Sequence, residues 1–283
     1  MNNLFEKLSD LPALRDVIRD HDLWAEKKLG QNFLLDLNLT DKIARAAGDI
    51  SDCTVFEIGP GPGGLTRSIL KAGPKKTIAI EFDPRAIEAL SSLKDAVQDS
   101  LEVIKGDALQ QDLRALSEAP RAIIANLPYN IATPLLLNWL QQIRDNQNSY
   151  RSMTLMFQKE VAERITAPQE NKAYGRLSVM VQWLCDVHQV FDVPASAFLP
   201  PPKVTSSIVH FRPKMLDKKN PSFKSVEQIT AQAFGQRRKM IRSSLKNYKN
   251  YFESLGLDET LRAENLKISD FINLAKAVES KEI

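Results

Sequence analysis

Short apolar runs alternate with amphipathic segments along the first part of the chain. Some of these runs have the length and composition of buried strands: TVFEIG (54–59), TIAIEF (77–82), LEVIKGD (101–107), AIIAN (122–126) and MTLMFQ (153–158). Helical patterns lie between and after them: GLTRSILKAG (64–73), DPRAIEALSSLKDA (83–96), TPLLLNWLQQI (133–143) and KEVAERI (159–165). This alternation predicts βαβ units, and hence an α/β fold in which helices cover both faces of a mostly parallel sheet.

Two further strand-like segments follow the alternating part. WLCDVHQVFDV (183–193) and VTSSIVHFR (204–212) are separated by a Pro-rich turn, PASAFLPPPK. A connection this short and without a helix favours an antiparallel pair, so the sheet is expected to end in an antiparallel hairpin. The polar segment 212–222 has the composition of a linker, and residues 223–283 show helical patterns. These observations predict two domains: residues 1–212, and a small all-α domain over 213–283.

Two helices are expected before the first strand. The apolar spacing predicts one over residues 9–21, with Ser9 as its N-cap, and another from Asp36 to Ala47, ended by Gly48.

Composition is compatible with this fold and indicates the cellular compartment. The 283 residues are 43% hydrophobic, which is enough for one sizeable core and a small second domain. A net charge of +3 says little about partners. Cys53 and Cys185 have neither disulfide-framework nor metal-ligand spacing, so reduced cytosolic thiols and no metal are expected. There is no signal-like N-terminus and no long apolar run, so we expect a cytoplasmic protein without a membrane span.

A glycine-rich turn, EIGPGPGG (57–64), ends the first buried strand. Gly59, Gly61 and Gly64 fit the dinucleotide pattern G-x-G-x-x-G, which is a weak signal by itself. Pro60 and Pro62 lack the N–H groups that a pyrophosphate site needs. A ligand without phosphates, such as S-adenosylmethionine (SAM), therefore fits better. A tight turn without any ligand is the alternative.

Two acids follow the loop at the ends of successive strands. Glu81 lies about 20 residues downstream, where a carboxylate can accept hydrogen bonds from ribose hydroxyls. Asp107, in KGDAL, can accept from an adenine amino group. Each could instead be a helix cap, but two such acids beside a glycine loop favour a nucleoside site.

The next strand runs into Asn126-Leu127-Pro128-Tyr129. The exocyclic amine of adenine is planar and a poor nucleophile, so it must become pyramidal to attack a methyl donor. The side-chain oxygen of Asn126 and the carbonyl of Leu127 can accept its two hydrogens and stabilise the developing charge. Pro128 stiffens the turn, and Tyr129 offers a ring for stacking. A plain strand-to-helix turn is the alternative.

Together, EIGPGPG, AIE, GDA and NLPY resemble class I SAM-dependent methyltransferases that act on planar amine nitrogens. GQNFLLD (30–36), VPASAFLPPPKVTSS (193–207) and AFGQRRKMIRSSL (233–245) narrow the resemblance to the KsgA/RsmA family of small-subunit ribosomal RNA adenine dimethyltransferases. The resemblance implies a Rossmann-like domain, SAM as methyl donor, and methylation of two adjacent adenosines in a hairpin loop near the 3′ end of that RNA. It also implies a substrate within the 30S particle, a role in small-subunit biogenesis, and a monomer.

The resemblance also implies roles for individual residues. The SAM-binding set would be Asn32, Leu34, Gly59, Gly61, Glu81, Asp107 and Asn126. The catalytic set would be Asn126, Leu127, Tyr129 and Phe198, with the rings of Tyr129 and Phe198 stacking on the target adenine. The alternative for Phe198 is packing of the hairpin.

A basic segment lies in the expected C-terminal domain. The fifteen residues 235–249 hold six basic residues and no acid. A solvated helix face is the common explanation of such a pattern. Beside an adenine-modifying site, phosphate contact becomes the better interpretation. The candidates for RNA contact are Arg237, Arg238, Lys239, Arg242 and Lys246.

Other functions fit parts of the pattern. A macrolide-resistance type of large-subunit rRNA adenine methyltransferase would share the SAM and NLPY features. A protein glutamine methyltransferase uses a related Asn-Pro-Pro-Tyr turn, but Leu127 replaces the first proline here. An RNA-binding assembly factor without activity would not need Gly59, Glu81 and Asp107. A nicotinamide dehydrogenase conflicts with the prolines of the loop.

Overall fold

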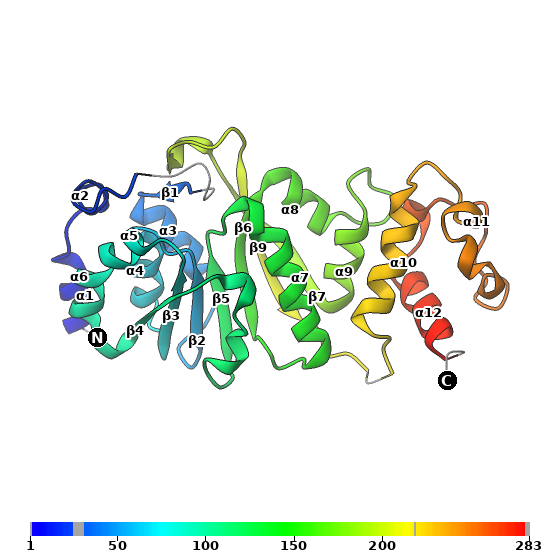
Figure 1. Ribbon diagram of the computed structural model, residues 1–283, viewed down its shortest axis with the longest axis horizontal. Helices are drawn as coiled ribbons and strands as arrows, with labels where there is room; N and C mark the ends of the chain where they lie inside the picture. Colours follow the sequence, from blue (N-terminus) through cyan, green and yellow to red (C-terminus); the bar gives the residue numbers. More distant parts are fainter. Residues whose placement is uncertain (1, 25–30, 218, 281–283) are drawn as a thin grey trace. The chain divides into compact units, whose positions relative to one another are not determined.

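A computed structural model describes residues 2–24, 31–217 and 219–280 (Figure 1). Gly30, the first residue of the GQNFLLD motif, lies outside the described residues. The chain forms two compact units. The first contains Met1–Trp139, Asn148–Lys159 and His188–Arg212, and the second contains Leu140–Gln147, Glu160–Val187 and Pro213–Ile283.

The main sheet has the strand order β4-β3-β2-β5-β6-β9-β7 in the described part of the chain. Its strands are β2 Thr54–Ile58, β3 Lys76–Glu81, β4 Leu101–Lys105, β5 Arg121–Ala125, β6 Ser152–Gln158, β7 Cys185–Val193 and β9 Ser206–Pro213. β2 to β6 pair in parallel, whereas β9 pairs antiparallel to β6. The predicted mostly parallel sheet ending in an antiparallel hairpin is confirmed.

The strand order explains where a ligand site can form. From β2 the chain proceeds to β3 and β4 on one side, and then crosses to β5 and β6 on the other (Figure 1). Open α/β sheets bind ligands at such a reversal, beyond the carboxyl ends of the strands. A second, two-stranded ribbon pairs β1 (Phe33–Leu34) with β8 (Phe198–Leu199).

The central strands of the parallel part are buried on both faces, whereas β4 at the edge is mostly half-buried. All five residues of β2 are buried, including Glu57, and so are five of the six residues of β3. Helices cover the sheet: α1 Asn2–Ser9, α2 Leu14–Asp20, α3 Leu37–Arg45, α4 Gly64–Lys71, α5 Pro84–Ala89, α6 Ser91–Val97 and α7 Tyr129–Asp145. One core cluster joins apolar residues of α3 and α4 to inward-facing residues of β2, β5 and β6.

Short 3-10 turns connect these elements. They are η2 Gln98–Ser100, η3 Ala108–Gln110, η4 Leu113–Ala115 and η5 Ala195–Ala197.

The predicted N-terminal helix over residues 9–21 is wrong in its bounds. Ser9 is the last residue of α1 rather than an N-cap, and α2 begins at Leu14, after Ala13 in an extended conformation. Pro12 gives the physical reason, because a residue that precedes proline disfavours the helical region. The second predicted helix is confirmed as α3, and the Asp36 carboxylate caps it by accepting from the N–H groups of Asn38 and Leu39.

The strand predicted over 183–193 begins two residues late. Residues Arg176–Leu184 form helix α9, and β7 starts at Cys185. Trp183 and Leu184 are apolar enough to suit either element, so the length of the apolar run misplaced the boundary.

In its described residues, the second unit is mainly helical, with strand residues at the start of β7 and the end of β9 and one isolated bridge between Met240 and Arg262. It holds α8 Lys159–Thr166, α9, α10 Phe223–Gly235, α11 Ile241–Ser244 and α12 Ile268–Glu279, with 3-10 turns η6 Lys246–Tyr251 and η7 Ala263–Asn265. Aromatic contacts join three of its segments. The Phe234 ring centroid lies 5.8 Å from that of Tyr174, in an edge-to-face arrangement, and 5.7 Å from that of Phe271, in a tilted one. The last change of unit lies between Arg212 and Pro213, and α8 and α9 group with the C-terminal helices. The division into domains 1–212 and 213–283 stays a prediction.

The Asp36 cap yields a test of how α3 is anchored. Replacing Asp36 with Ala should lower the free energy of unfolding by about 1 kcal/mol, because two helix N–H groups lose their acceptor. Asp36→Asn, which keeps an acceptor oxygen, should restore most of the loss. Urea titrations of the three proteins measure the difference, and equal midpoints for Ala and wild type would contradict it.

Candidate cofactor and base site

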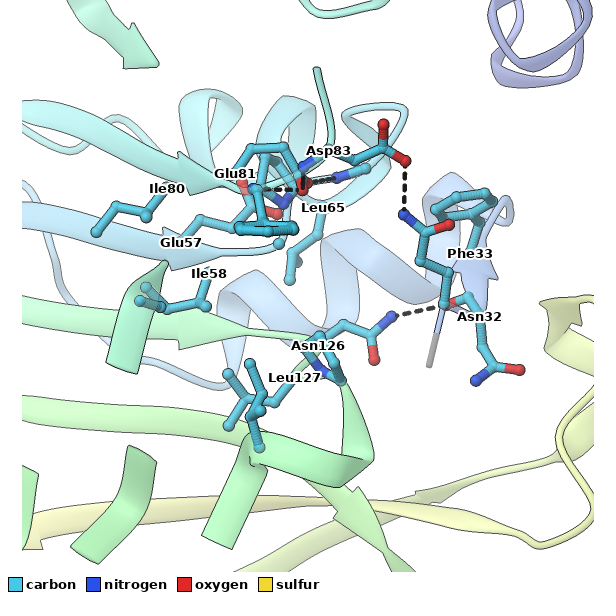
Figure 2. A pocket seen from close by; sticks show the side chains of 18 of the residues that line it. Asn32, Phe33, Glu57, Ile58, Leu65, Ile80, Glu81, Asp83, Asn126 and Leu127 are labelled. Carbon is cyan, nitrogen blue, oxygen red and sulfur yellow. Dashed lines mark hydrogen bonds between the residues drawn. The ribbon is translucent and has the colours of Figure 1, made fainter. Parts of the chain in front are cut away.

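A cavity opens at the carboxyl ends of the parallel strands in the first unit (Figure 2). It is lined by residues 31–34, 57–62, 64–65, 80–83, 106–109 and 126–131. The structure therefore brings together most of the residues singled out in the sequence: Asn32, Leu34, Gly59, Gly61, Glu81, Asp107, Asn126, Leu127 and Tyr129.

Glycine is required in the loop after β2 for two reasons. Gly59 and Gly61 have φ values of +67° and +54°, in the left-handed region that side chains disfavour. A Cβ atom on Gly61 would also lie 2.8 Å from the ring of Phe33. The loop can therefore fold tightly between the strand and α4 and leave its backbone open to the cavity.

Glu81 holds this loop in place. One carboxylate oxygen accepts from the N–H of Gly61 at 3.2 Å, and the other accepts from the N–H groups of Phe82 and Asp83 at 2.7 and 2.8 Å. Burial raises the pKa of this carboxyl, and the three backbone donors act in the opposite direction. The side chain is at once a brace for the loop and an acceptor at the rim of the cavity.

Asp107 also combines two tasks. It is the N-cap of η3, where its Oδ1 accepts from the N–H of Leu109 at 2.9 Å. It lies half-buried in the cavity lining. Asp107 is thus a helix cap, as the alternative interpretation expected. Its other carboxylate oxygen, Oδ2, lies 3.4 Å from the side-chain amide nitrogen of Gln110 and remains beside the cavity.

The orientation of the Asn126 amide is fixed by its partner. Its Nδ2 donates to the backbone carbonyl of Asn32 at 3.1 Å (Figure 2). A carbonyl can only accept, so the nitrogen of the amide must face Asn32 and the oxygen must face away. This leaves an acceptor atom in the cavity lining at the end of β5.

The rest of the NLPY turn supports this arrangement. The first hydrogen bonds of α7 run from Ile131 and Ala132 to the carbonyl of Pro128, so the Leu127 carbonyl lies outside the ladder of that helix. The Tyr129 hydroxyl and the Ser206 hydroxyl of β9 are 2.6 Å apart. Burial raises the pKa of Tyr129. The Tyr129 ring is therefore held at both ends.

Phe198 lies elsewhere. It is 5% exposed, pairs with Leu34 across the β1–β8 ribbon, and belongs to the core cluster that contains Val193 and Ile208. It does not occur among the residues that line the cavity. This geometry fits the hairpin-packing alternative, and stacking of Phe198 on a base stays a prediction.

Sequence reasoning missed the role of Glu57. This β2 residue lines the cavity and is 2% exposed, and its Oε2 has no hydrogen-bond partner among the described residues. Burial, together with the charge of Glu81, raises the pKa of Glu57 to about 8. The signal was present in the sequence: an ionisable residue inside an otherwise apolar strand, two residues before the glycine loop.

Other missed residues complete the rim. Phe82 follows Glu81, lines the cavity and is largely exposed, so its ring is available to a flat ligand. Gln31 donates to the Asp83 carboxylate at 3.1 Å and thereby ties the N-terminal segment to α5. An aromatic residue directly after a strand-end acid was the sequence signal for Phe82.

The basic segment is not one helix. α10 ends at Gly235, a turn follows, and α11 and η6 divide the remainder. Arg237 forms an ion pair with Glu264 at 2.9 Å and donates to the carbonyl of Lys172. Its role is therefore at least partly structural. The other candidates are exposed: Arg238, Lys239, Arg242 and Lys246.

Among the helices of residues 2–24, 31–217 and 219–280, none is long and apolar enough to cross a membrane. Within the same ranges, no group of three or more His, Cys, Asp or Glu side chains is arranged to hold a metal ion.

The buried Glu57 predicts a pH dependence of stability. Its pKa is higher in the folded than in the unfolded state, so the folded state binds more protons between about pH 4.5 and 8. Stability should therefore fall as pH rises through this window. Glu57→Gln should flatten that fall and be the more stable protein at pH 8.5. Thermal melts from pH 5 to 9 test this, and parallel profiles for the two proteins would contradict it.

Comparisons with known proteins agree with the site. A family model described as ribosomal RNA adenine dimethylase matches residues 24–280. Proteins of Rhodospirillum rubrum and Rhizobium etli, both named ribosomal RNA small subunit methyltransferase A, are 50% and 52% identical to this chain. The alignments cover 95% of this chain in both cases, and 93% and 98% of the two relatives.

Solved structures show the same fold. A dimethyladenosine transferase from Plasmodium falciparum has a TM-score of 0.73 and 30% identity, over 89% of this chain and 98% of that one. The 23S rRNA methyltransferase ErmE has a TM-score of 0.65 at 23% identity, over 88% and 100% of the two chains, and shows the fold alone. With its glycine loop, strand-end acids and NLPY turn in one cavity, the chain belongs to the ribosomal RNA adenine dimethylase family.

Proposed function

We propose that the protein is a SAM-dependent rRNA adenine N6-dimethyltransferase that acts on two adjacent adenosines of small-subunit rRNA. The observation that carries the proposal is the Asn126 amide, whose nitrogen is bound to the Asn32 carbonyl so that its oxygen is left as an acceptor. An acceptor fixed at the end of β5, beside the Leu127 carbonyl, suits an exocyclic amine with two hydrogens to place.

The cavity has the chemistry that SAM requires. The buried Glu57 carboxyl has an unpartnered oxygen that could bond a polar group of the ligand, and a cationic ligand nearby would favour its ionised form. Gly59 and Gly61 line the cavity without side chains, so the loop offers its backbone to a ligand there. Glu81 and Asp107 would accept from the ribose and the adenine amino group, and Phe82 would cover one face of the nucleoside.

SAM supplies a methyl group on a sulfonium. The chain needs to hold the target amine in line with that methyl, and aligning two bound reactants can remove several kcal/mol of barrier. Asn126 and Leu127 would orient the amine, while Tyr129, anchored to Ser206, would support the flat base. The proton leaves after attack, when the nitrogen is strongly acidic, so none of the site residues has to act as a base.

The competing functions fit less well. The relatives at 50% and 52% identity are named for the small subunit, which argues against the macrolide-resistance type acting on the large subunit. Leu127 and the basic segment argue against protein glutamine methylation. The intact cavity lining argues against an assembly factor without activity, and Pro60 and Pro62 argue against a nicotinamide dehydrogenase.

The proposal also covers the position of the target in the RNA, the particle that carries the RNA and the cellular compartment. We place the target in a hairpin loop near the 3′ end of the RNA within the 30S particle, with a role in small-subunit biogenesis in the cytoplasm. Residues 213–283 would serve as a helical, basic domain that docks on the particle, and the protein would act as a monomer. The exposed residues 238, 239, 242 and 246 support this docking role because no acid interrupts them.

Transfer of labelled methyl groups tests the proposed substrate. Undermethylated small subunits, large subunits and protein-free RNA should be compared as acceptors under identical conditions. The proposal expects strong labelling of the small subunits and little of the other two. Preferential labelling of large subunits would support the macrolide-resistance type instead.

Removing the acceptor should stop catalysis without removing the cofactor. We expect Asn126→Ala to lower single-turnover methyl transfer at least a hundredfold, equivalent to about 3 kcal/mol of transition-state stabilisation. Asn138→Ala, on the exposed side of α7, is the matched control and should react like wild type. A folded Asn126→Ala protein with near-normal turnover would refute the assigned role.

The exposed basic residues should govern docking. Changing Arg238, Lys239, Arg242 and Lys246 together to Gln should flatten the slope of log affinity against log salt by roughly three units. SAM affinity should not change. Arg237 is left in place because its ion pair with Glu264 supports the second unit.

A matched charge control separates docking from net charge. Four exposed lysines outside the basic segment can be changed to Gln in the same way: Lys75, Lys94, Lys105 and Lys224. Particle binding measured at several salt concentrations should show a much smaller change of slope for this control. Equal slopes for both variants would remove the basic segment from the RNA interface.

A further inference from the structure

A second groove lies in the first unit and is distinct from the cofactor cavity. It runs between α1 and α2 on one side and the Pro-rich loop 194–201 on the other, and α3 and α4 contribute the remaining wall. We call it the α4 groove. The motifs discussed above assign no role to this groove. Of the candidate site residues, only Phe198 lines it.

Arg67 of α4 lines this groove in an unusual state. The residue is 7% exposed, and its Nε atom is buried without a hydrogen-bond partner among the described residues. Burial lowers the pKa of its guanidinium, and no neighbouring carboxylate offsets this. A buried guanidinium that no carboxylate neutralises is costly, so a ligand that supplies negative charge would stabilise it.

The acids of the groove are already engaged elsewhere. Asp36 accepts from two N–H groups at the start of α3. Asp41 accepts from the Ser68 hydroxyl and from the Lys71 ammonium, both at 2.7 Å. The charge of Arg67 is therefore left for an external anion, and Arg15 adds a further exposed cation to the lining.

Exposed apolar side chains lie in the same groove. Trp24 is 58% exposed, and Leu37 and Leu199 are also exposed. A cationic floor combined with an accessible aromatic ring is the combination that single-stranded nucleic acids use, since phosphates need positive charge and bases need a flat partner. A purely apolar peptide would leave Arg67 unpaired.

One two-stranded ribbon contributes residues to both the cofactor cavity and the α4 groove. β1 and β8 form one ribbon, in which Leu34 lines the cavity and its partner Phe198 lines the groove. An RNA strand whose target base enters the cavity would cross this ribbon and continue into the groove.

We propose that the α4 groove binds the RNA strand next to the target adenosine, with Arg67 holding a phosphate and Trp24 stacking on a flanking base. The inference rests on the proposed function for the identity of the RNA. It adds a binding site on the methyltransferase unit itself, separate from the basic segment of residues 235–249.

Arg67→Met gives the sharpest test, because binding and stability should move in opposite directions. Methionine keeps length and helix propensity and removes the charge. The variant should melt at the same or a higher temperature than wild type, since a buried unpaired charge is lost. Its affinity for undermethylated small subunits should fall roughly ten- to a hundredfold, with a salt slope flatter by about 0.7.

Further variants test which properties of Arg67 and Trp24 the RNA binding requires. Arg67→Lys keeps the charge without the planar fork and should bind with intermediate affinity. Trp24→Ala should weaken binding about tenfold and Trp24→Phe should restore most of it. Lys75→Met, an exposed charge loss between α4 and β3, should behave like wild type. SAM affinity should be unchanged throughout.

A single-stranded oligoadenylate serves as a second probe and separates this inference from the proposed function. If wild type methylates no ribosomal RNA but Arg67→Met still loses oligoadenylate affinity, the groove stands and the proposed function fails. If wild type methylates small subunits while Arg67→Met and Trp24→Ala bind both probes normally, the groove inference is overturned. Loss of thermal stability in Arg67→Met with unchanged affinity for small subunits and oligoadenylate would also overturn the groove inference.

Discussion

The hydrogen bond from the Asn126 amide to the Asn32 carbonyl is the constraint on which the site depends. It joins the N-terminal segment before β1 to the turn after β5, although 94 residues separate the two in sequence. It also determines which end of the amide faces the cavity. Without that bond, the amide could present a donor instead of an acceptor, and the proposed orientation of the target amine by Asn126 would be lost.

Two ionisable groups that are costly to bury lie near the glycine loop. Glu57 lies in the middle of the sheet with an unpartnered oxygen, and Arg67 lies one turn into α4 with an unpartnered nitrogen. Glu57 lines the cofactor cavity and Arg67 lines the α4 groove, and in both proposals a ligand would supply the missing partner. Protein stability is given up locally for recognition, as is usual at binding sites.

Much of the fold and of the cavity could be predicted because local signals agreed with tertiary structure. Strand-length apolar runs gave β2 to β6, and glycines with positive φ gave the loop. Contacts between distant segments could not be predicted: nothing local shows that Asn126 meets Asn32, that Phe198 enters the core, or that Glu264 pairs with Arg237. The proline at position 12 was a local signal that the helical spacing overrode.

Identification of the methylated nucleoside shows whether the protein dimethylates N6 of adenosine in small-subunit rRNA. Undermethylated small subunits can be treated with the protein and SAM carrying a heavy-isotope methyl group, and their RNA digested to nucleosides for mass spectrometry. The account predicts N6,N6-dimethyladenosine with two heavy methyl groups, at two adjacent positions near the 3′ end. Label at another atom of adenine, in another base, or in ribosomal protein would contradict it.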